Sequence, residues 1–106
     1  MKLKYSVKLT DLSPQMALAA SIVSSVYRDL DAGASCTITS ANDSKHSANS
    51  WHYKGRALDF RTHDFQSDKH QLLHELKEAL GPQFDVLLEG EGTPNEHIHV
   101  EYDPKD

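Results

Sequence analysis

The sequence has only one cysteine, so no disulfide bond can form within the chain. Long apolar runs are also missing, and no apolar segment follows the basic residues at the N-terminus. We therefore expect no membrane span and no secretory signal peptide, and a protein that stays in the cytoplasm unless another component releases or carries it. Acidic residues outnumber basic residues 16 to 11, which gives a formal net charge of -5. This negative charge argues against nucleic acid as the main partner.

A length of 106 residues suits one domain, residues 1–106, with a modest core and a single site. Because no disulfide is available, packing or a metal ion must hold this domain together. Cys36 lies in a strand-like run, where a buried and inert thiol is the ordinary interpretation. What the chain has in excess is histidine. Seven histidines in so short a sequence indicate metal binding or acid–base chemistry.

The apolar periodicity predicts two helices and five strands. One helix begins at Ser13-Pro14, an N-cap followed by proline in the first turn, and ends at Gly33. A second helix covers residues 67–80, with leucines at three- and four-residue intervals. Residues 40–49 are polar and aperiodic, which is typical of a functional loop. The predicted strands cover residues 2–12, 36–39, 57–60, 84–88 and 97–102.

The last predicted strand carries two histidines on one face. Side chains alternate along a strand, so His97, His99 and Glu101 point one way while the apolar residues between them point the other. This pattern alone is as typical of a solvated polar face as of a metal site. Asp59 favours the metal site, because a carboxylate in an otherwise apolar strand should be paired or metal-bound.

His52 precedes Asp59 in the chain, and Gly55 between them allows the backbone to turn so that both side chains reach one ion. Zinc accepts imidazole nitrogen and carboxylate oxygen, and a catalytic zinc has three protein ligands and one water. His52, Asp59 and one histidine of the last strand would supply that set. Such an ion would polarise a scissile carbonyl and lower the pKa of its water towards about 7.

Hydrolysis also needs a general base. Glu96, directly before the last strand, is the best-placed carboxylate, and Glu89 and Glu91 in the preceding turn are weaker candidates. A rival metal pair is His70 with His74, at the spacing found in helical zinc proteases, but a glutamine stands where that signature has glutamate. We expect both of these histidines on the solvated side of their helix.

The two blocks of residues resemble the hedgehog signalling domain and the D-Ala-D-Ala metallopeptidases that share its fold, including phage endolysins and dipeptidases. The predicted order of helices and strands is similar to this family over most of the chain. The resemblance implies an α+β fold, a small antiparallel sheet with two main helices packed on one face. The matching positions are Ser50, His52, Gly55, Ala57 and Asp59 in the first block, and Glu96, His99 and Glu101 in the second.

For this chain, the resemblance implies one zinc ion bound by His52, Asp59 and His99, with Glu96 as the general base. His97 would then lie beside the metal or on the substrate side. His46 would lie next to the open coordination position, where a protonated imidazole could stabilise an oxyanion.

Other positions of the chain bear on whether the site is catalytic. Tyr53 and Arg56 make the first block closer to hedgehog domains than to typical peptidases, and both are candidates for contact with the substrate or the metal ligands. Arg56 or Lys45 could hold a substrate carboxylate. The peptidases usually carry an arginine near the place where this chain has Asp43. Glu96, in contrast, stands where active peptidases keep their base and hedgehog domains do not.

We therefore expect a monomeric zinc-dependent peptidase, a D,D- or L,D-carboxypeptidase or endopeptidase that hydrolyses peptidoglycan peptides. The alternative is a non-catalytic, zinc-stabilised binding module of hedgehog type, which would bind zinc tightly without turnover. A third possibility is a metal-free structural protein with a histidine-rich face. Metal analysis separates the third from the first two, because a metal that binds only the native state raises its stability.

Overall fold

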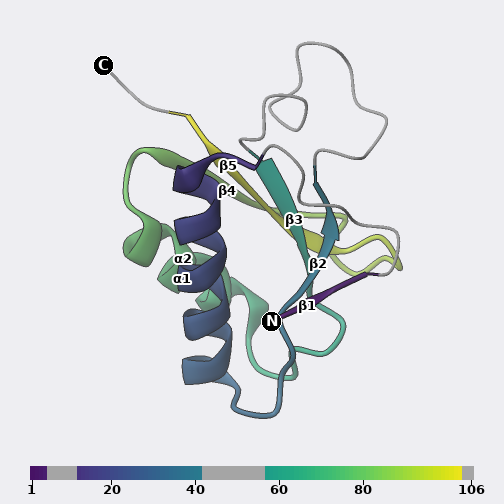
Figure 1. Ribbon diagram of the computed structural model, residues 1–106. Coiled ribbons are helices and arrows are strands. Elements are labelled where there is room, and N and C mark those ends of the chain that lie inside the picture. Colours follow the sequence, from purple (N-terminus) through teal and green to yellow (C-terminus); the bar gives the residue numbers. More distant parts are fainter. Residues whose placement is uncertain (5–11, 42–56, 104–106) are drawn as a thin grey trace.

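Two helices and five strands make up the described part of the chain (Figure 1). The structure is a computed structural model that describes residues 1–4, 12–41 and 57–103. Within these ranges, neither helix has the length and apolar character needed to cross a membrane. The elements are β1 (Lys2–Leu3), α1 (Pro14–Leu30), β2 (Thr37–Ser40), β3 (Ala57–Arg61), α2 (Lys69–Leu80), β4 (Phe84–Glu89) and β5 (His97–Tyr102).

The strands form one sheet in the order β1-β2-β3-β5-β4. The predicted α+β fold is confirmed, but the sheet is mixed, because β1 pairs parallel with β2 while the other neighbours pair antiparallel. Parallel neighbours need a crossover connection, and the segment that contains α1 supplies it. The strand predicted for residues 2–12 is observed as Lys2–Leu3, and residues 5–11 lie outside the described part of the chain.

α1 begins where the sequence predicts. The Ser13 hydroxyl accepts a hydrogen bond from the Met16 backbone N–H at 3.2 Å, and proline follows in the first turn. The helix ends at Leu30, with Asp31 in an extended conformation as its C-cap in place of the predicted Gly33. The N-terminal prediction was sharper because the capping side chain is a local signal.

α2 begins at Lys69, because the Asp68 carboxylate accepts hydrogen bonds from backbone N–H groups of the first turn. It ends at Leu80, and its C-cap is Gly81, whose φ of 85° a glycine adopts without steric cost. The side chains of His70 and His74 are 66% and 69% exposed. Their predicted position on the solvated side of the helix is confirmed.

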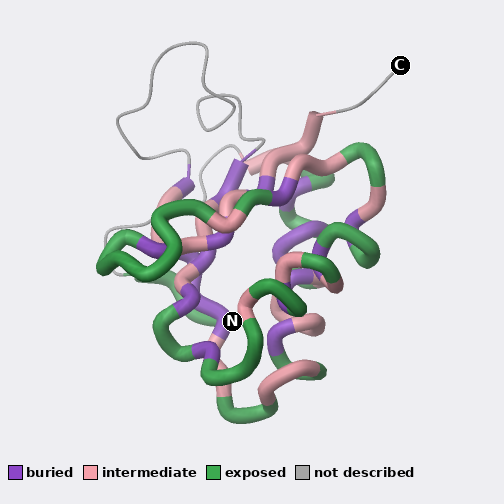
Figure 2. The backbone as a smooth tube through the Cα atoms, turned by 180° about the vertical axis from the view of Figure 1, so that it is seen from behind, coloured by how far each residue is buried: buried purple, intermediate pink, exposed green. Residues whose placement is uncertain are grey.

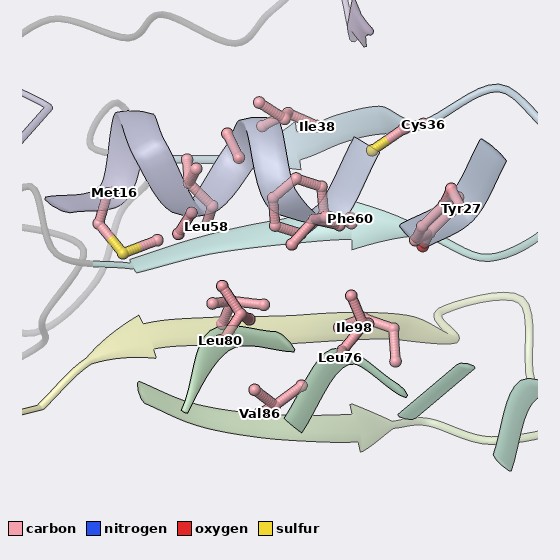
Figure 3. Close-up of a cluster of buried hydrophobic side chains, with 14 of the residues drawn as sticks. Met16, Tyr27, Cys36, Ile38, Leu58, Phe60, Leu76, Leu80, Val86 and Ile98 are labelled. Carbon is pink, nitrogen blue, oxygen red and sulfur yellow. The ribbon is translucent and has the colours of Figure 1, made fainter. Parts of the chain in front are cut away.

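The hydrophobic core lies between the helices and one face of the sheet (Figure 3). Leu58 and Phe60 of β3, and Ile98 and Val100 of β5, are completely buried in it. Because side chains alternate along a strand, the intervening residues point to the opposite face, called the open face below. The helices contribute Met16, Val23 and Tyr27 from α1 and Leu72, Leu76 and Leu80 from α2.

Cys36 belongs to this core and is only 5% exposed. Burial raises the pKa of its thiol to about 12. A thiol with so high a pKa stays protonated at neutral pH and is a poor nucleophile. The prediction that Cys36 is buried is confirmed, and the raised pKa of its thiol supports the predicted lack of reactivity.

Candidate metal centre

The open face of the sheet brings together polar side chains from three strands. Asp59 on β3 lies directly opposite His99 on β5, and Glu89 on β4 lies directly opposite His97. Directly paired residues of antiparallel strands project on the same side of the sheet. The structure therefore places Asp59, His97 and His99 together, as the sequence predicts, and adds Glu89 to them.

His99 lies between two carboxylates. Its Nδ1 is 2.8 Å from Asp59 Oδ1, and its Nε2 is 2.7 Å from Glu101 Oε1. Burial disfavours the charged imidazole, but the hydrogen bonds to Asp59 and Glu101 outweigh burial and raise the pKa of His99 from 6.5 to about 9. In the metal-free protein at neutral pH, each ring nitrogen of His99 therefore donates a proton to a carboxylate.

His97 connects Glu89 to this cluster. Its Nε2 lies 3.0 Å from Glu89 Oε1 and 3.9 Å from Asp59 Oδ1. Its Nδ1 faces the backbone oxygen of Asn95 at 2.6 Å. Contacts at both nitrogens fix the ring, so His97 holds the Glu89 carboxylate close to Asp59.

Asp59, Glu89 and His99 form a group that could hold a metal ion. One ligand atom of each residue lies within 4.8 Å of the others. Bonds of about 2.0–2.2 Å place the ligand atoms of a tetrahedral site about 3.4 Å apart, so a small contraction of the side chains suffices. Glu101, on the far nitrogen of His99, is the kind of partner that metal-bound histidines usually have. These residues fit a divalent metal ion.

A second group on the sheet consists of Asp85, Glu101 and Asp103, whose carboxylates also approach within 4.8 Å of one another. This group contains no imidazole, and Glu101 is already bonded to His99. Surface carboxylates often cluster without binding an ion. The group that contains His99 is therefore the candidate centre.

Glu96, the base that the motif predicts, is buried just before β5 and is 7% exposed, whereas residues 90–95 before it are exposed (Figure 2). Its Oε1 lies 2.7 Å from Lys69 Nζ and accepts a hydrogen bond from the Thr62 hydroxyl at 2.5 Å. Its Oε2 accepts the Gly92 backbone N–H at 2.9 Å. Glu96 thus ties together the start of α2, the end of β3 and the turn between β4 and β5.

These contacts also make Glu96 a weak proton acceptor. Burial alone would raise its pKa, but the hydrogen bonds from Lys69, Thr62 and Gly92 outweigh burial and lower the pKa from 4.5 to about 2. A general base works best when its pKa lies near the working pH. The geometry therefore favours a structural role for Glu96.

Glu96→Gln should destabilise the protein by about 2 kcal/mol at neutral pH, because it leaves the Lys69 ammonium without its counter-ion. The folded pKa of about 2 lies below the ordinary 4.5, so the charged carboxylate stabilises the fold fully above pH 4.5 and loses this effect as the pH falls towards 2. Urea unfolding of both proteins near pH 7, 5 and 3 should show a difference that shrinks with acidity.

Glu91→Gln is the matched control for this experiment. The Glu91 side chain is 54% exposed and pairs with the exposed His70, and such pairs contribute at most about 1 kcal/mol. Equal losses in the two variants, or a loss in Glu96→Gln that is constant across the pH range, would contradict the anchoring role of Glu96.

Four of the predicted site residues lie outside the described part of the chain. These are His46, His52, Tyr53 and Arg56. Their roles as oxyanion stabiliser, metal ligand and substrate contacts stay predictions.

Sequence reasoning ranked Glu89 below Glu96 and passed over Arg61. The alternation of side chains along the strands could have corrected this ranking, because it predicts which residues face the core and which face the open side. Glu96 has the same parity as the buried Ile98 and Val100, whereas Arg61 has the parity of the open-face residues.

The family model of the hedgehog amino-terminal signalling domain matches residues 15–100. The matched range contains Asp59, Glu89, His97 and His99. No curated protein and no solved structure matches the chain.

Proposed function

This chain belongs to the family of hedgehog amino-terminal signalling domains, and on that basis we propose that it is a zinc-dependent peptidase acting on peptidoglycan peptides. Hedgehog-like domains share their superfamily with zinc peptidases. The observation that carries the proposal is the position of Glu89 beside Asp59 and His99 on the open face. Hydrolysis by water requires such a carboxylate, because the water loses a proton as it attacks.

We assign the zinc ligands to His52, Asp59 and His99. When bound, zinc would polarise a peptide carbonyl and lower the pKa of water at the site. Glu101 would keep its hydrogen bond to Nε2 of His99 and so fix the orientation of the ring. The assignment of Asp59 and His99 is supported by their direct pairing across β3 and β5, and that of His52 by the sequence motif.

Glu89 is our candidate for the general base. Its side chain is 47% exposed, so water can reach it, and its Oε1 is oriented by His97 Nε2 at 3.0 Å. Glu96 is the alternative base, because the motif places it there. Its side chain is 6% exposed and its oxygens contact Lys69 and Gly92, so Glu89 is the better placed of the two.

The substrate side of the proposal rests on the sequence motif. His46 would stabilise the oxyanion, and Tyr53 and Arg56 would contact the peptide. We propose that the protein acts as a monomer and cleaves cross-linking or stem peptides of peptidoglycan, with either D,D or L,D specificity.

A non-catalytic, zinc-stabilised binding module is a second candidate. The family description, a signalling domain, favours it. Such a module would use the same Asp59 and His99 as zinc ligands, but Glu89 would have no reaction to serve. It predicts zinc binding without cleavage of any peptide.

Digestion of purified peptidoglycan, followed by mass analysis of the fragments, tests the proposed function. We expect the zinc-loaded protein to release peptide fragments or free amino acids, and a chelator to stop the release. Zinc should also raise the unfolding free energy by about 4 kcal/mol at a free concentration 1,000 times its Kd. Zinc-dependent stabilisation without any fragment would favour the binding module instead.

Asp59→Asn and Asp29→Asn form a matched pair for this test. Asp29 is an exposed residue of α1, whereas Asp59 is a proposed ligand. Asp29→Asn should keep both zinc and cleavage, and Asp59→Asn should lose both. Cleavage that survives in Asp59→Asn would contradict a metal mechanism at this site.

A further inference from the structure

β4 forms one edge of the sheet, and within the described part of the chain the outer side of its backbone pairs with no strand. Such an edge offers a row of backbone N–H and C=O groups to any extended chain that approaches it. At the opposite edge, β1 has only two residues, Lys2–Leu3. β4 is therefore the edge that is long enough to accept a further strand.

β4 has few of the features that usually protect an edge strand. It runs for six residues, Phe84–Glu89, without proline or lysine. Its pairing with β5 is continuous, with no bulge to twist the edge away. Leu87, in the middle of the strand, is 48% exposed on the open face. An edge that is regular and apolar at its centre is a template for strand addition.

A groove of about 660 Å³ runs along this edge. The end of α2 and the turn that follows it form one wall, and β4 forms the other. Pro82 in the turn and Phe84, Val86 and Leu87 of β4 are the apolar part of the lining. The side chains of an added strand would therefore find an apolar surface next to the backbone of β4.

The charged groups around this edge are mostly acidic. Asp85 and Glu89 project from β4 on the open face. The described lining of the groove also includes Glu78 and Glu101, against one basic residue, Lys77. Basic side chains opposite Asp85 and Glu89 would stabilise an added strand, and acidic side chains there would destabilise it.

These charges disfavour a second copy of this chain as the added strand. Antiparallel pairing of two β4 strands about Leu87 would place Asp85 of each copy opposite Glu89 of the other. Like charges directly opposite each other destabilise a sheet, and each chain carries a formal net charge of -5. A basic segment of a different protein meets neither obstacle.

We propose that the edge of β4 binds an extended segment of a partner protein, an apolar stretch with one basic residue at each end. The segment would hydrogen-bond to the outer backbone of β4 and place its basic side chains, four positions apart, opposite Asp85 and Glu89. Its apolar side chains would lie in the groove and beside Leu87. In this mode of recognition, main-chain hydrogen bonds supply affinity and the side-chain pattern supplies specificity.

Titration of short peptides into isotope-labelled protein, followed by backbone amide chemical shifts, tests the proposal without any measurement of peptidase activity. The probe is acetyl-Thr-Lys-Val-Leu-Val-Lys-Thr-amide, and the comparison peptide has glutamate in place of both lysines. The lysine peptide should bind roughly tenfold more tightly, because two favourable cross-strand pairs replace two unfavourable ones. The largest shifts should fall on residues 84–89.

N-methylation of alternate peptide amides separates strand addition from a purely electrostatic contact. Only one alternate set of peptide N–H groups points at β4 in a ladder. Methylation of that set should weaken binding roughly tenfold, because the hydrogen bonds are lost. Methylation of the other set should leave the affinity unchanged.

Leu87→Lys and Leu18→Lys form a matched pair of variants. Both leucines are exposed, Leu87 by 48% and Leu18 by 64%, but Leu18 lies on α1. A lysine at position 87 repels the lysines of the peptide and should weaken its binding roughly tenfold, whereas Leu18→Lys should leave the binding unchanged.

Three results would overturn the proposal. The first is equal affinity for the lysine and glutamate peptides, or for the two methylated sets. The second is no measurable binding of the lysine peptide, which would identify Asp85 and Glu89 as charges that only protect the edge. The third is self-association of the protein alone that Leu87→Lys abolishes, because a second copy would then occupy the edge.

Discussion

Glu89→Gln should lower kcat by a factor of about 10² to 10⁴ while the protein keeps its zinc. Glutamine preserves the size of the side chain and its contact with His97 but cannot accept a proton from water. The loss should fall on kcat more than on KM, because the base acts in the transition state and not in substrate binding. Zinc content after gel filtration and steady-state kinetics on a muropeptide would measure both quantities.

Two further glutamates serve as controls for this variant. Glu91→Gln changes an exposed carboxylate in the same turn and should leave kcat unchanged. Glu96→Gln should keep kcat within about tenfold once the variant is folded, because the carboxylate is buried and already bonded to Lys69, Thr62 and Gly92. The opposite result would identify Glu96 as the base. In that case Glu96→Gln would be folded and bind zinc but be inactive, while Glu89→Gln would stay active.

Glu89→Gln also separates two roles that the geometry allows. The Glu89 carboxylate lies within 4.8 Å of the ligand atoms of Asp59 and His99, so it can serve as a metal ligand or as a base. Loss of zinc in Glu89→Gln would make Glu89 a ligand and would contradict its role as the general base. Retained zinc with lost activity supports Glu89 as the base.

Local signals predicted the helices and most of the sheet. The capping residues Ser13 and Asp68 and the apolar intervals of the helices depend only on neighbouring residues, so the sequence alone locates them. The parallel pairing of β1 with β2 was not predicted, because pairing joins distant residues and nothing within a two-residue strand specifies its partner. Non-local contacts of this kind are the part of a fold that periodicity leaves open.

The same distinction between local and non-local signals explains which residues of the candidate site could be predicted. His97 and His99 share a face by alternation alone, so their common direction was predictable. Glu89 reaches them only because β4 and β5 pair with Glu89 opposite His97, and this register depends on the length and shape of the turn at residues 90–96. Glu96 is closer in sequence to the histidines, but its side chain is used to hold that turn. Proximity in sequence therefore favoured Glu96, whereas the strand register places Glu89 on the exposed side of the cluster.

Zinc affinity should rise about 50-fold between pH 7 and pH 9, because the ion must displace a proton from His99, which still holds it in half of the molecules at pH 9. The pKa of His99 in the metal-free protein is about 9, so below this pH each unit of acidity costs about a factor of ten in affinity. The stability of the metal-free protein should change in the opposite direction and fall as the pH rises. A folded pKa raised from 6.5 to about 9 stabilises the fold fully below pH 6.5, and this contribution, about 3 kcal/mol, is lost as the pH rises through 9.

Competition with a chromophoric chelator, corrected for the protonation of the chelator, would give the affinity at each pH. Calorimetry in buffers of different ionisation enthalpy should show about one proton released per zinc near pH 7.5. Glu101→Gln removes one of the two carboxylates that raise the pKa of His99, so it should flatten the pH dependence of zinc affinity in this range. Glu78→Gln, next to the exposed His74, should leave the dependence as it is. A pH-independent affinity in the unmodified protein would show that zinc displaces no proton from His99 in this range, which contradicts the combination of a raised pKa and a role as ligand.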